Sequence, residues 1–433
     1  MLTRNTTTLL LIGIVSILCY QTHRRTRDAL VVADALNLID QRYIDPVDHR
    51  QLLLSALDGM TKGLDPYSEF VPLDQYQELQ SAMSGEFAGI GIYVDRPDPD
   101  GPVSVITPLV GSPALQAGLM AGDKIVEIDG QDVSNLGLSQ VSSRLKGIVG
   151  TTVAMVVLRD GRRVDLTVRR GNIQIESVVG YERLPDQSWS HAIPGHPSVA
   201  YARLTTFGEK TPDELNEVLE GLSPSQTSLI LDLRGNGGGL LDTAVAICDL
   251  FLAGGVVVST EVRGGTIEWR YTVGDDTAIE DSMPVVVMVD HNSASASEIV
   301  AAALQDRGRA TIVGTRSFGK GTVQNVLPLE TGRSALKLTV ARYLRPSGAN
   351  IHRGEDDTPE DVWGVSPQPN HLVPLNEEDQ RRLFLDWRQR AFPFAAQVDS
   401  VEGQQDDADW RDPQLMRAVE VLVGAEVELG AAA

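Results

Sequence analysis

The sequence has few cysteines, few aromatic side chains and no excess of positive charge. Two cysteines, Cys19 and Cys248, occur among 433 residues, which excludes a disulfide framework or a cysteine-based metal site within one folded domain. Lysine and arginine number 37 against 59 aspartate and glutamate, which gives a formal charge of −22. Such a surface repels phosphate backbones, so we expect no nucleic acid partner. The 42% hydrophobic content is that of an ordinary globular protein.

The N-terminus carries an apolar run, residues 9–20, with Arg4 before it and three arginines soon after it. The run is shorter than the roughly 20 residues that a membrane-spanning helix needs. We interpret residues 1–26 as a signal anchor or signal peptide, and favour an uncleaved anchor because no small-residue cleavage site follows. The arginines after the run argue for the opposite orientation, with the chain kept in the cytoplasm. A buried helix of a soluble protein is the alternative.

Hydrophobic spacing changes along the chain and suggests four further regions. Residues 27–85 have helical spacing, and residues 86–170 have short apolar alternations separated by Asp-Gly turns. In residues 171–375, apolar strands alternate with helical segments, which predicts parallel strands with crossover helices and hence an α/β core. One of those helices has Thr211 as its expected N-cap, with Glu214 completing a capping box. Residues 376–433 are charged and end in a helical stretch.

A glycine-rich turn, residues 232–239 (DLRGNGGG), follows one apolar strand of the predicted core and opens a helix. Its backbone N–H groups can point at an anion. A dinucleotide site is disfavoured, because the third glycine of the G-x-G-x-x-G pattern would fall at Leu240. The other use of such N–H groups is an oxyanion hole, which needs a backbone that approaches the substrate closely.

Two other turns carry candidate catalytic side chains. Residues 290–298 (DHNSASASE) join a strand to a helix, where a serine Oγ lies beside free N–H groups and suits a nucleophile. The alternative is that these serines only cap the helix. Residues 317–324 (SFGKGTVQ) place Lys320 and Gln324 on one face. A lysine is a general base only if its environment lowers its pKa from about 10.4, and a solvated surface lysine is the alternative.

From Asp28 to Gln368 the sequence closely resembles the C-terminal processing peptidases, also called tail-specific proteases. These are serine endopeptidases with a Ser-Lys catalytic centre and an inserted PDZ domain. The resemblance depends on seven segments in the family order: LDPYSEF at Leu64, FAGIGI at Phe87, GSPALQAGLMAGDKIVEIDG at Gly111, LDLRGNGGGLL at Leu231, SASASEIVAAALQD at Ser293, SFGKGTVQ at Ser317 and LTVARYLRPSGANI at Leu338.

The resemblance assigns catalytic roles to five residues. It implies that Ser295 is the nucleophile, that Lys320 is the base and that Gln324 orients the lysine. It also implies an oxyanion hole made by the backbone N–H groups of Ala296 and Gly238. The residue types suit these roles, because Ala296 begins the expected helix and a glycine can adopt backbone angles closed to other residues.

Two departures from the family pattern leave details open. Gly237 stands where the family usually has proline, so the oxyanion donor stays open among residues 237–239. Lys146-Gly147 stands where the family's PDZ domain commonly ends a helix with Arg-Gly, so a regulatory role for a PDZ arginine there is in doubt.

The resemblance also predicts a peptide-binding loop in the PDZ domain. PDZ domains bind an extended C-terminal peptide as an added strand and hold its carboxylate with backbone N–H groups. The segment Gly89-Ile90-Gly91-Ile92, with Phe87 before it, fits that loop. The alternative is that the glycines only permit a bulge.

Together these features predict an α/β protein of five parts. The expected protease core, residues 171–375, has a mixed sheet with crossover helices and is ClpP/crotonase-like. The inserted β-rich PDZ domain spans residues 86–170. A helical module, residues 27–85, follows the signal segment, and the charged helical tail, residues 376–433, ends the chain.

The leading functional hypothesis is a serine endopeptidase that recognises C-terminal tails of unfolded or exposed proteins and cleaves them. We expect it to be extracytoplasmic, in the periplasm, and anchored to the inner membrane. Its expected partners are substrates with free C-termini; an adaptor protein and a homo-oligomer stay open, and no cofactor is expected. The alternative is a non-catalytic PDZ scaffold of the same fold. A Ser-His-Asp hydrolase using His291 and Asp290 is weaker, and no HExxH pattern supports a metal hydrolase.

Overall fold

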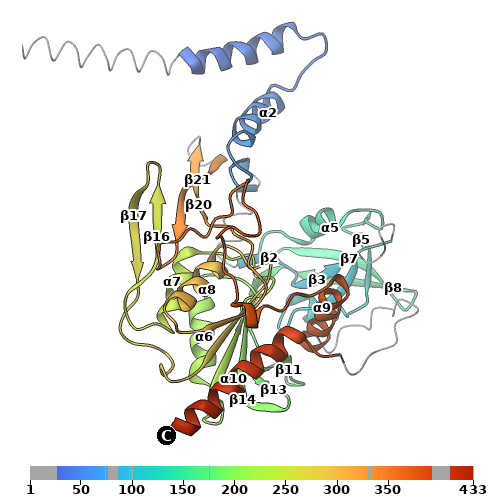
Figure 1. The fold of residues 1–433 in the computed structure, drawn as a ribbon. Coiled ribbons are helices and arrows are strands. Elements are labelled where there is room, and N and C mark those ends of the chain that lie inside the picture. The colour runs from blue at the N-terminus through green and yellow to red at the C-terminus, as the bar shows by residue number, and fades with distance from the viewer. Residues whose placement is uncertain are drawn as a thin grey trace, which may run out of the picture. The chain divides into compact units, whose positions relative to one another are not determined.

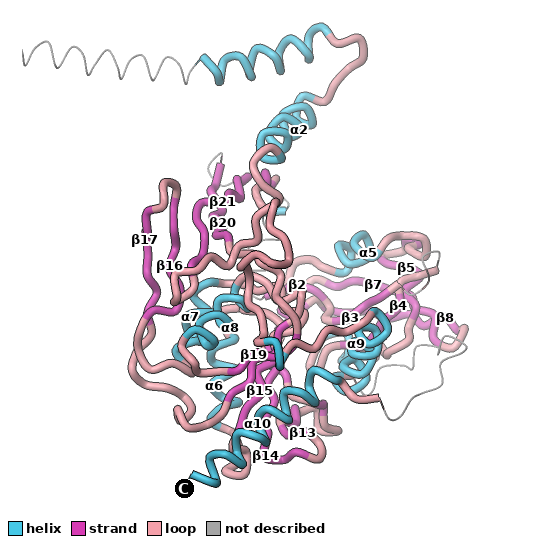
Figure 2. The backbone as a smooth tube through the Cα atoms, in the orientation of Figure 1, coloured by secondary structure: helices cyan, strands magenta, loops and turns pink. Residues whose placement is uncertain are grey.

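The computed structural model describes residues 27–73, 75–76, 86–96, 98, 101–174, 176–329, 334–392 and 410–432 (Figures 1 and 2). The predicted signal segment, residues 1–26, lies outside the described residues, as does part of the predicted tail. Within those described ranges, no helix is both long and apolar enough to cross a membrane. The chain divides into two compact units, one made of residues 1–76 and 324–339 and the other of the remainder.

The smaller unit combines helices with strands. Residues 27–42 are helical, and α2 (His49–Lys62) begins where the Asp48 carboxylate accepts from the N–H of Arg50 at 2.8 Å. A short strand, β1 (Glu69–Val71), pairs antiparallel with the first part of β21 (Ser334–Leu344), and β20 (Thr322–Leu329) also pairs with β21. The helical spacing of residues 27–85 therefore indicates the two helices but not strand β1.

In the larger unit, residues 86–174 form a β-rich fold. Its antiparallel sheet has the order β3-β4-β5-β7-β8, with β6 paired to β5. The bounds are β2 (Glu86–Gly89), β3 (Ile92–Asp95), β4 (Ser104–Pro108), α4 (Pro113–Gln116), β5 (Lys124–Ile128), β6 (Gln131–Asp132), α5 (Leu138–Leu145), β7 (Thr152–Arg159), β8 (Arg162–Arg169) and β9 (Gly171–Gln174). Strands β2 and β9 pair antiparallel, so both ends of this region lie side by side, as an insertion requires.

The core of the larger unit is a mixed sheet of order β10-β14-β15-β18-β19. Strands β14, β15, β18 and β19 run parallel, whereas β10 and β13 run antiparallel to β14. The bounds are β10 (Val178–Val179), β13 (Ala192–Ile193), β14 (His196–Leu204), α6 (Thr211–Glu220), β15 (Ser228–Asp232), α7 (Leu241–Asp249), β18 (Val285–Val289), α8 (Ala296–Asp306) and β19 (Thr311–Gly314). The predicted α/β architecture with a mixed sheet is confirmed.

Further elements surround this sheet in the larger unit. A hairpin of β16 and β17 pairs with the end of β21, and β11 pairs with β12. The bounds are β11 (Glu182–Arg183), β12 (Trp189–Ser190), β16 (Val256–Val262), β17 (Thr266–Thr272), the 3-10 turn η1 (Pro369–His371), α9 (Glu377–Ala391) and α10 (Pro413–Ala432).

Helices cover both faces of the core sheet. Leu231, on β15, belongs to a buried cluster with residues of α7 and α8, whereas its neighbour Ile230 belongs to a second cluster with residues of α10. Figure 1 shows α10, in red, on the opposite side of the strands from α6, α7 and α8. Because successive side chains of a strand face opposite sides, a strand buried on both faces needs a continuous apolar run. This explains the sequence of β15, SLILD.

Helix α6 begins differently from the prediction. Lys210 occupies the cap position, and the Thr211 hydroxyl accepts from the N–H of Gly208 at 2.9 Å. The Glu214 carboxylate accepts from the N–H and the hydroxyl of Ser177, at 2.8 and 2.7 Å, rather than from the helix start. The predicted capping box is therefore wrong, because Glu214 makes a contact between α6 and the segment before β10.

Replacing either Leu231 or Ile230 by alanine should cost about 2–5 kcal/mol of unfolding free energy, because both side chains are fully buried on opposite faces. Denaturant unfolding measures this, with Val362→Ala as control because Val362 is 82% exposed. A loss below about 0.5 kcal/mol for Ile230→Ala would contradict burial of that face under α10.

Candidate active site

The three turns singled out in the sequence follow three neighbouring parallel strands. Residues 232–239 begin at the last residue of β15, residues 290–298 follow β18, and residues 317–324 follow β19 and continue into β20. The carboxyl ends of parallel strands meet at one edge of a sheet, where α/β proteins bind ligands. Backbone hydrogen bonds join the turns there: Ala294 N–H donates to Asn236 O at 3.0 Å, and Phe318 N–H donates to Ser293 O at 2.9 Å.

Ser295 occupies a strained corner between β18 and α8. Its φ of 56° and ψ of −115° lie outside the regions that residues with a Cβ favour. Such backbone persists only where surrounding contacts impose it. Here Ser295 N–H donates to Glu298 Oε2 at 2.9 Å, while Ser295 O accepts from Glu298 and Ile299. A sharp turn of this kind presents a serine hydroxyl at the end of a strand, as nucleophilic serines require.

Glu298 joins the serine turn to the lysine loop. The residue is fully buried, and its Oε1 accepts from the Ser317 hydroxyl and from Gly319 N–H, both at 2.6 Å. Its Oε2 accepts from the N–H groups of Ser295 and Lys320, at 2.9 and 2.8 Å. Burial raises the pKa of the Glu298 carboxyl above its ordinary value, although the four hydrogen bonds oppose that shift. One carboxylate thus fixes the backbone of both predicted catalytic residues.

The sequence motifs did not identify Glu298 as a functional residue, although its spacing from Ser295 gives a local signal. The spacing Ser-x-x-Glu over residues 295–298 is that of a capping box at a helix start. In the structure Ser295 N–H donates to Glu298 Oε2, which is one half of such a box, and the carboxylate also accepts from three donors outside the helix. Those donors lie about 20 residues further along the chain, beyond any helical spacing.

The loop that carries Lys320 approaches other backbone closely. A Cβ on Gly321 would lie 2.2 Å from His352 N, so only glycine fits beside the lysine. Lys320 itself is half-buried. Gln324, the predicted orienting residue, belongs to the smaller unit, where its amide donates to Thr339 Oγ1 at 3.5 Å. The proposed action of Gln324 on Lys320 stays a prediction.

The predicted oxyanion residues lie against the serine turn. A Cβ on Gly238, whose φ is 98°, would lie 2.9 Å from both Ala296 N and Ser295 Cβ. The Gly238 N–H donates to Asn236 Oδ1 at 2.8 Å. Among the described residues, the N–H groups of Ala296, Gly237 and Gly239 have no hydrogen-bond acceptor. The donor within residues 237–239 therefore stays a prediction, and Gly237 and Gly239 offer the uncommitted groups.

The predicted peptide-binding loop precedes an edge strand. Gly89 pairs with Gly171 at the end of β2, and the Phe87 backbone lies opposite Ile173, whereas its side chain is outside the described part. Ile90 is 2% exposed, so its side chain packs in the domain core. Ile92 begins β3, which lies at the end of the sheet order and pairs, among described strands, with β4 alone. An edge strand can accept an added peptide strand.

Gly91, the central residue of that loop, has a φ of 74°. Its carbonyl accepts from Leu109 N–H at 3.0 Å, and a Cβ there would lie 2.6 Å from Ser112 Cβ. The loop is therefore closely packed, and a larger residue at position 91 would displace it.

The alternative pair, His291 and Asp290, is not arranged for nucleophilic catalysis. Asp290 Oδ1 accepts from the N–H groups of Gly235, Asn292 and Ser293, at 2.9, 3.0 and 3.0 Å, and so holds the turn. His291 is exposed and contacts the Asn292 amide at 3.1 Å. In a triad the carboxylate must orient the histidine.

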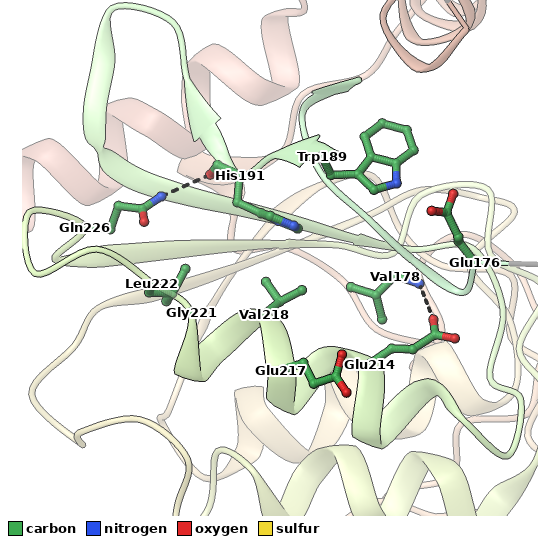
Figure 3. Close-up of a pocket in the computed structure, with 10 residues that line it drawn as sticks. All are labelled: Glu176, Val178, Trp189, His191, Glu214, Glu217, Val218, Gly221, Leu222 and Gln226. Atoms are coloured by element: carbon green, nitrogen blue, oxygen red, sulfur yellow. Dashed lines mark hydrogen bonds between the residues drawn. The ribbon is translucent and has the colours of Figure 1, made fainter. Parts of the chain in front are cut away.

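A cavity of about 460 Å³ lies elsewhere in the larger unit (Figure 3). It lies between helix α6 and the segments around β10 and β12. Its lining residues are Glu176, Val178, Trp189, His191, Glu214, Glu217, Val218, Gly221, Leu222 and Gln226. None of the predicted catalytic residues lines it, so this cavity is not the candidate active site.

Replacing Glu298 by glutamine should lower kcat at least about 100-fold, because an amide NH2 would face N–H donors and displace Ser295 or Lys320. The exposed Glu280→Gln is the matched control in the same unit. Peptide hydrolysis measures the effect, and activity within twofold of wild type would show that the carboxylate does not organise the site.

Gly238→Ala should also abolish hydrolysis, because the new Cβ would lie 2.7 Å from Ala294 O beside the serine. Gly264→Ala is the control, because Gly264 also has a positive φ (91°) but no atom lies within 4 Å of a Cβ there. We expect Gly264→Ala to keep most activity in the same assay. Wild-type activity in Gly238→Ala would show that the close approach at Gly238 is not needed.

Family models and curated relatives match this chain over most of its length. Residues 198–362 match peptidase family S41, and residues 78–158 match the PDZ domain. The chain is 36% identical over 362 residues to a carboxy-terminal-processing protease of Bartonella bacilliformis, covering 80% of this chain and 78% of that protein. It is 35% identical over 321 residues to a carboxyl-terminal-processing protease of Synechocystis, covering 73% and 72%.

One solved structure with a similar sequence is also found. The photosystem II D1 C-terminal processing protease is 29% identical, with a TM-score of 0.47, and the match covers 79% of this chain and 92% of that one.

Proposed function

This chain belongs to the carboxy-terminal processing proteases of peptidase family S41, and on that premise we propose which of its residues carry the reaction. It is a serine-type peptidase with a PDZ domain. In the proposed assignment Ser295 is the nucleophile and Lys320 the general base. The observation that carries it is the shared carboxylate of Glu298, which binds the backbone N–H of both residues.

In the proposed reaction, Ser295 Oγ attacks the peptide carbonyl while neutral Lys320 accepts its proton. The negative oxygen of the tetrahedral intermediate is bound by Ala296 N–H and by one N–H of residues 237–239, with Gly238 the donor that family resemblance favours. Ala296 begins α8, where the helix dipole favours negative charge. Lys320 then gives its proton to the leaving amine, and water hydrolyses the acyl-enzyme. Gln324 is proposed to orient the lysine.

Substrate selection is proposed to reside in the PDZ domain. An edge strand such as β3 can bind an extended peptide through main-chain hydrogen bonds, and N–H groups of the loop at Gly89 to Ile92 would bind its carboxylate. A peptide tail bound by the PDZ domain would raise the local concentration of the substrate backbone near Ser295. The expected substrates are unfolded or exposed protein tails with a free C-terminus.

We also propose a fold relationship for the core, a helical N-terminal module and a cellular location. Parallel strands with the crossover helices α6, α7 and α8 support a ClpP/crotonase-like core, and two helical segments support an N-terminal helical module. The apolar run at residues 9–20 supports an extracytoplasmic, periplasmic protein with an inner-membrane anchor. An adaptor protein and a homo-oligomer are further hypotheses.

Ser295→Ala should abolish hydrolysis of an unstructured protein without unfolding the chain, whereas the exposed control Ser282→Ala should keep full activity. Lys320→Arg should be inactive too, because a guanidinium stays protonated. Turnover by purified Ser295→Ala above the background of the assay would refute the assignment of Ser295 as nucleophile.

A peptide in free-acid form should be cleaved with higher kcat/KM than the same peptide as a C-terminal amide. Gly91→Ala should reduce that difference, because a Cβ there would collide with Ser112. The control is Gly118→Ala, which shares the positive φ but has no atom within 4 Å of a Cβ. If the wild type cleaves acid and amide equally, tail recognition is wrong and a general protease for unfolded chains is the better description.

A further inference from the structure

The turn at residues 232–239 contains a buried arginine that is hydrogen-bonded to residues at the start of helix α10. Arg234, in this turn, is 3% exposed. Its Nη2 and Nε donate to the Asp232 carboxylate at 2.7 and 3.0 Å. Its Nη1 donates to Asp412 Oδ2 at 2.8 Å and to Gln414 Oε1 at 3.0 Å. Asp412 lies 178 residues further along the chain than Arg234.

All members of this cluster are buried and hydrogen-bonded. Asp232, Asp412 and Gln414 are 0%, 5% and 1% exposed. Burial would raise the pKa of the Asp232 carboxyl, but Arg234 and then Arg203 hold that pKa below its ordinary value. Removing one partner from a buried charge pair leaves the other charge uncompensated. Arg234 therefore depends on Asp412 as well as on Asp232.

The two carboxylate oxygens of Asp412 make different contacts. Oδ1 accepts from the N–H groups of Gln414 and Leu415, at 3.0 and 3.1 Å, and so caps the start of α10. Oδ2 accepts from Arg234. Helix α10 then packs Leu415 and its following apolar residues against the sheet that carries Tyr201, whose hydroxyl donates to Asp232 at 2.7 Å.

The residues that follow Arg234 are hydrogen-bonded to the turn that carries Ser295. Gly235 N–H donates to Asp290 Oδ1 at 2.9 Å, and Asn236 O accepts from Ala294 N–H at 3.0 Å and from the Ser297 hydroxyl at 2.9 Å. A displacement of Arg234 would therefore shift the glycines that follow it, relative to Ser295.

We propose that Asp412 is a positioning residue for oxyanion binding. Its carboxylate fixes the Arg234 guanidinium, and Arg234 in turn fixes the glycine turn at residues 235–239. The inference rests on the proposed function of that turn. The start of α10 would then help to position the glycine turn through Arg234.

The test compares Asp412→Ser with Asp412→Ala in the full chain. Serine is a good helix N-cap, so it keeps α10 capped, but it is too short to reach Arg234. We expect kcat for a peptide to fall about 10- to 100-fold in both variants, with KM within about twofold. A peptide boronate, whose adduct places a negative oxygen in the oxyanion hole, should bind more weakly by a similar factor. A smaller folded fraction would lower kcat but leave boronate affinity unchanged.

Asp386→Ser is the matched control, because it breaks the ion pair with Arg390 on α9 and does not touch Arg234. Recovery of wild-type kcat in Asp412→Ser but not in Asp412→Ala would reduce Asp412 to a helix cap and overturn the inference. Equal loss in Asp386→Ser would overturn it as well. A wild-type chain that cleaves no peptide would refute the proposed function itself, and the inference with it.

Discussion

The arrangement of the active site depends on one buried carboxylate that accepts four hydrogen bonds. Glu298 binds Ser295 N–H on its own turn and three donors of the loop after β19, including Lys320 N–H. A buried carboxylate without such donors would be costly, and so would the buried donors of Ser317 and Gly319 without an acceptor. This mutual need keeps Ser295 at a φ of 56° that its own Cβ disfavours.

A second layer of buried contacts fixes the other side of the site. Arg234 is bound by Asp232 at the end of β15 and by Asp412 at the start of α10. The glycine turn that follows Arg234 is thereby attached to strand β15 and to helix α10, which covers one face of the sheet. The serine turn, the lysine loop and the glycine turn are each held by a buried charge, which gives the precision that catalysis requires.

The sequence could predict the local features of this site but not its long-range contacts. Strand periodicity and glycine spacing placed the three turns at strand ends, because both are encoded within a few residues. The roles of Glu298 and Asp412 depend on donors about 20 and 178 residues away, which no local pattern reveals. The predicted cap at Thr211 failed for the same reason, since Glu214 contacts Ser177 instead.

The most direct test of this account is to trap the acyl-enzyme. A peptide ester would be mixed with the wild-type chain, quenched in acid within one turnover and mapped by mass spectrometry. The account predicts one acyl group, on Ser295, whose rate of formation falls steeply in Glu298→Gln. An acyl group on another residue, or unchanged acylation without the Glu298 carboxylate, would contradict it.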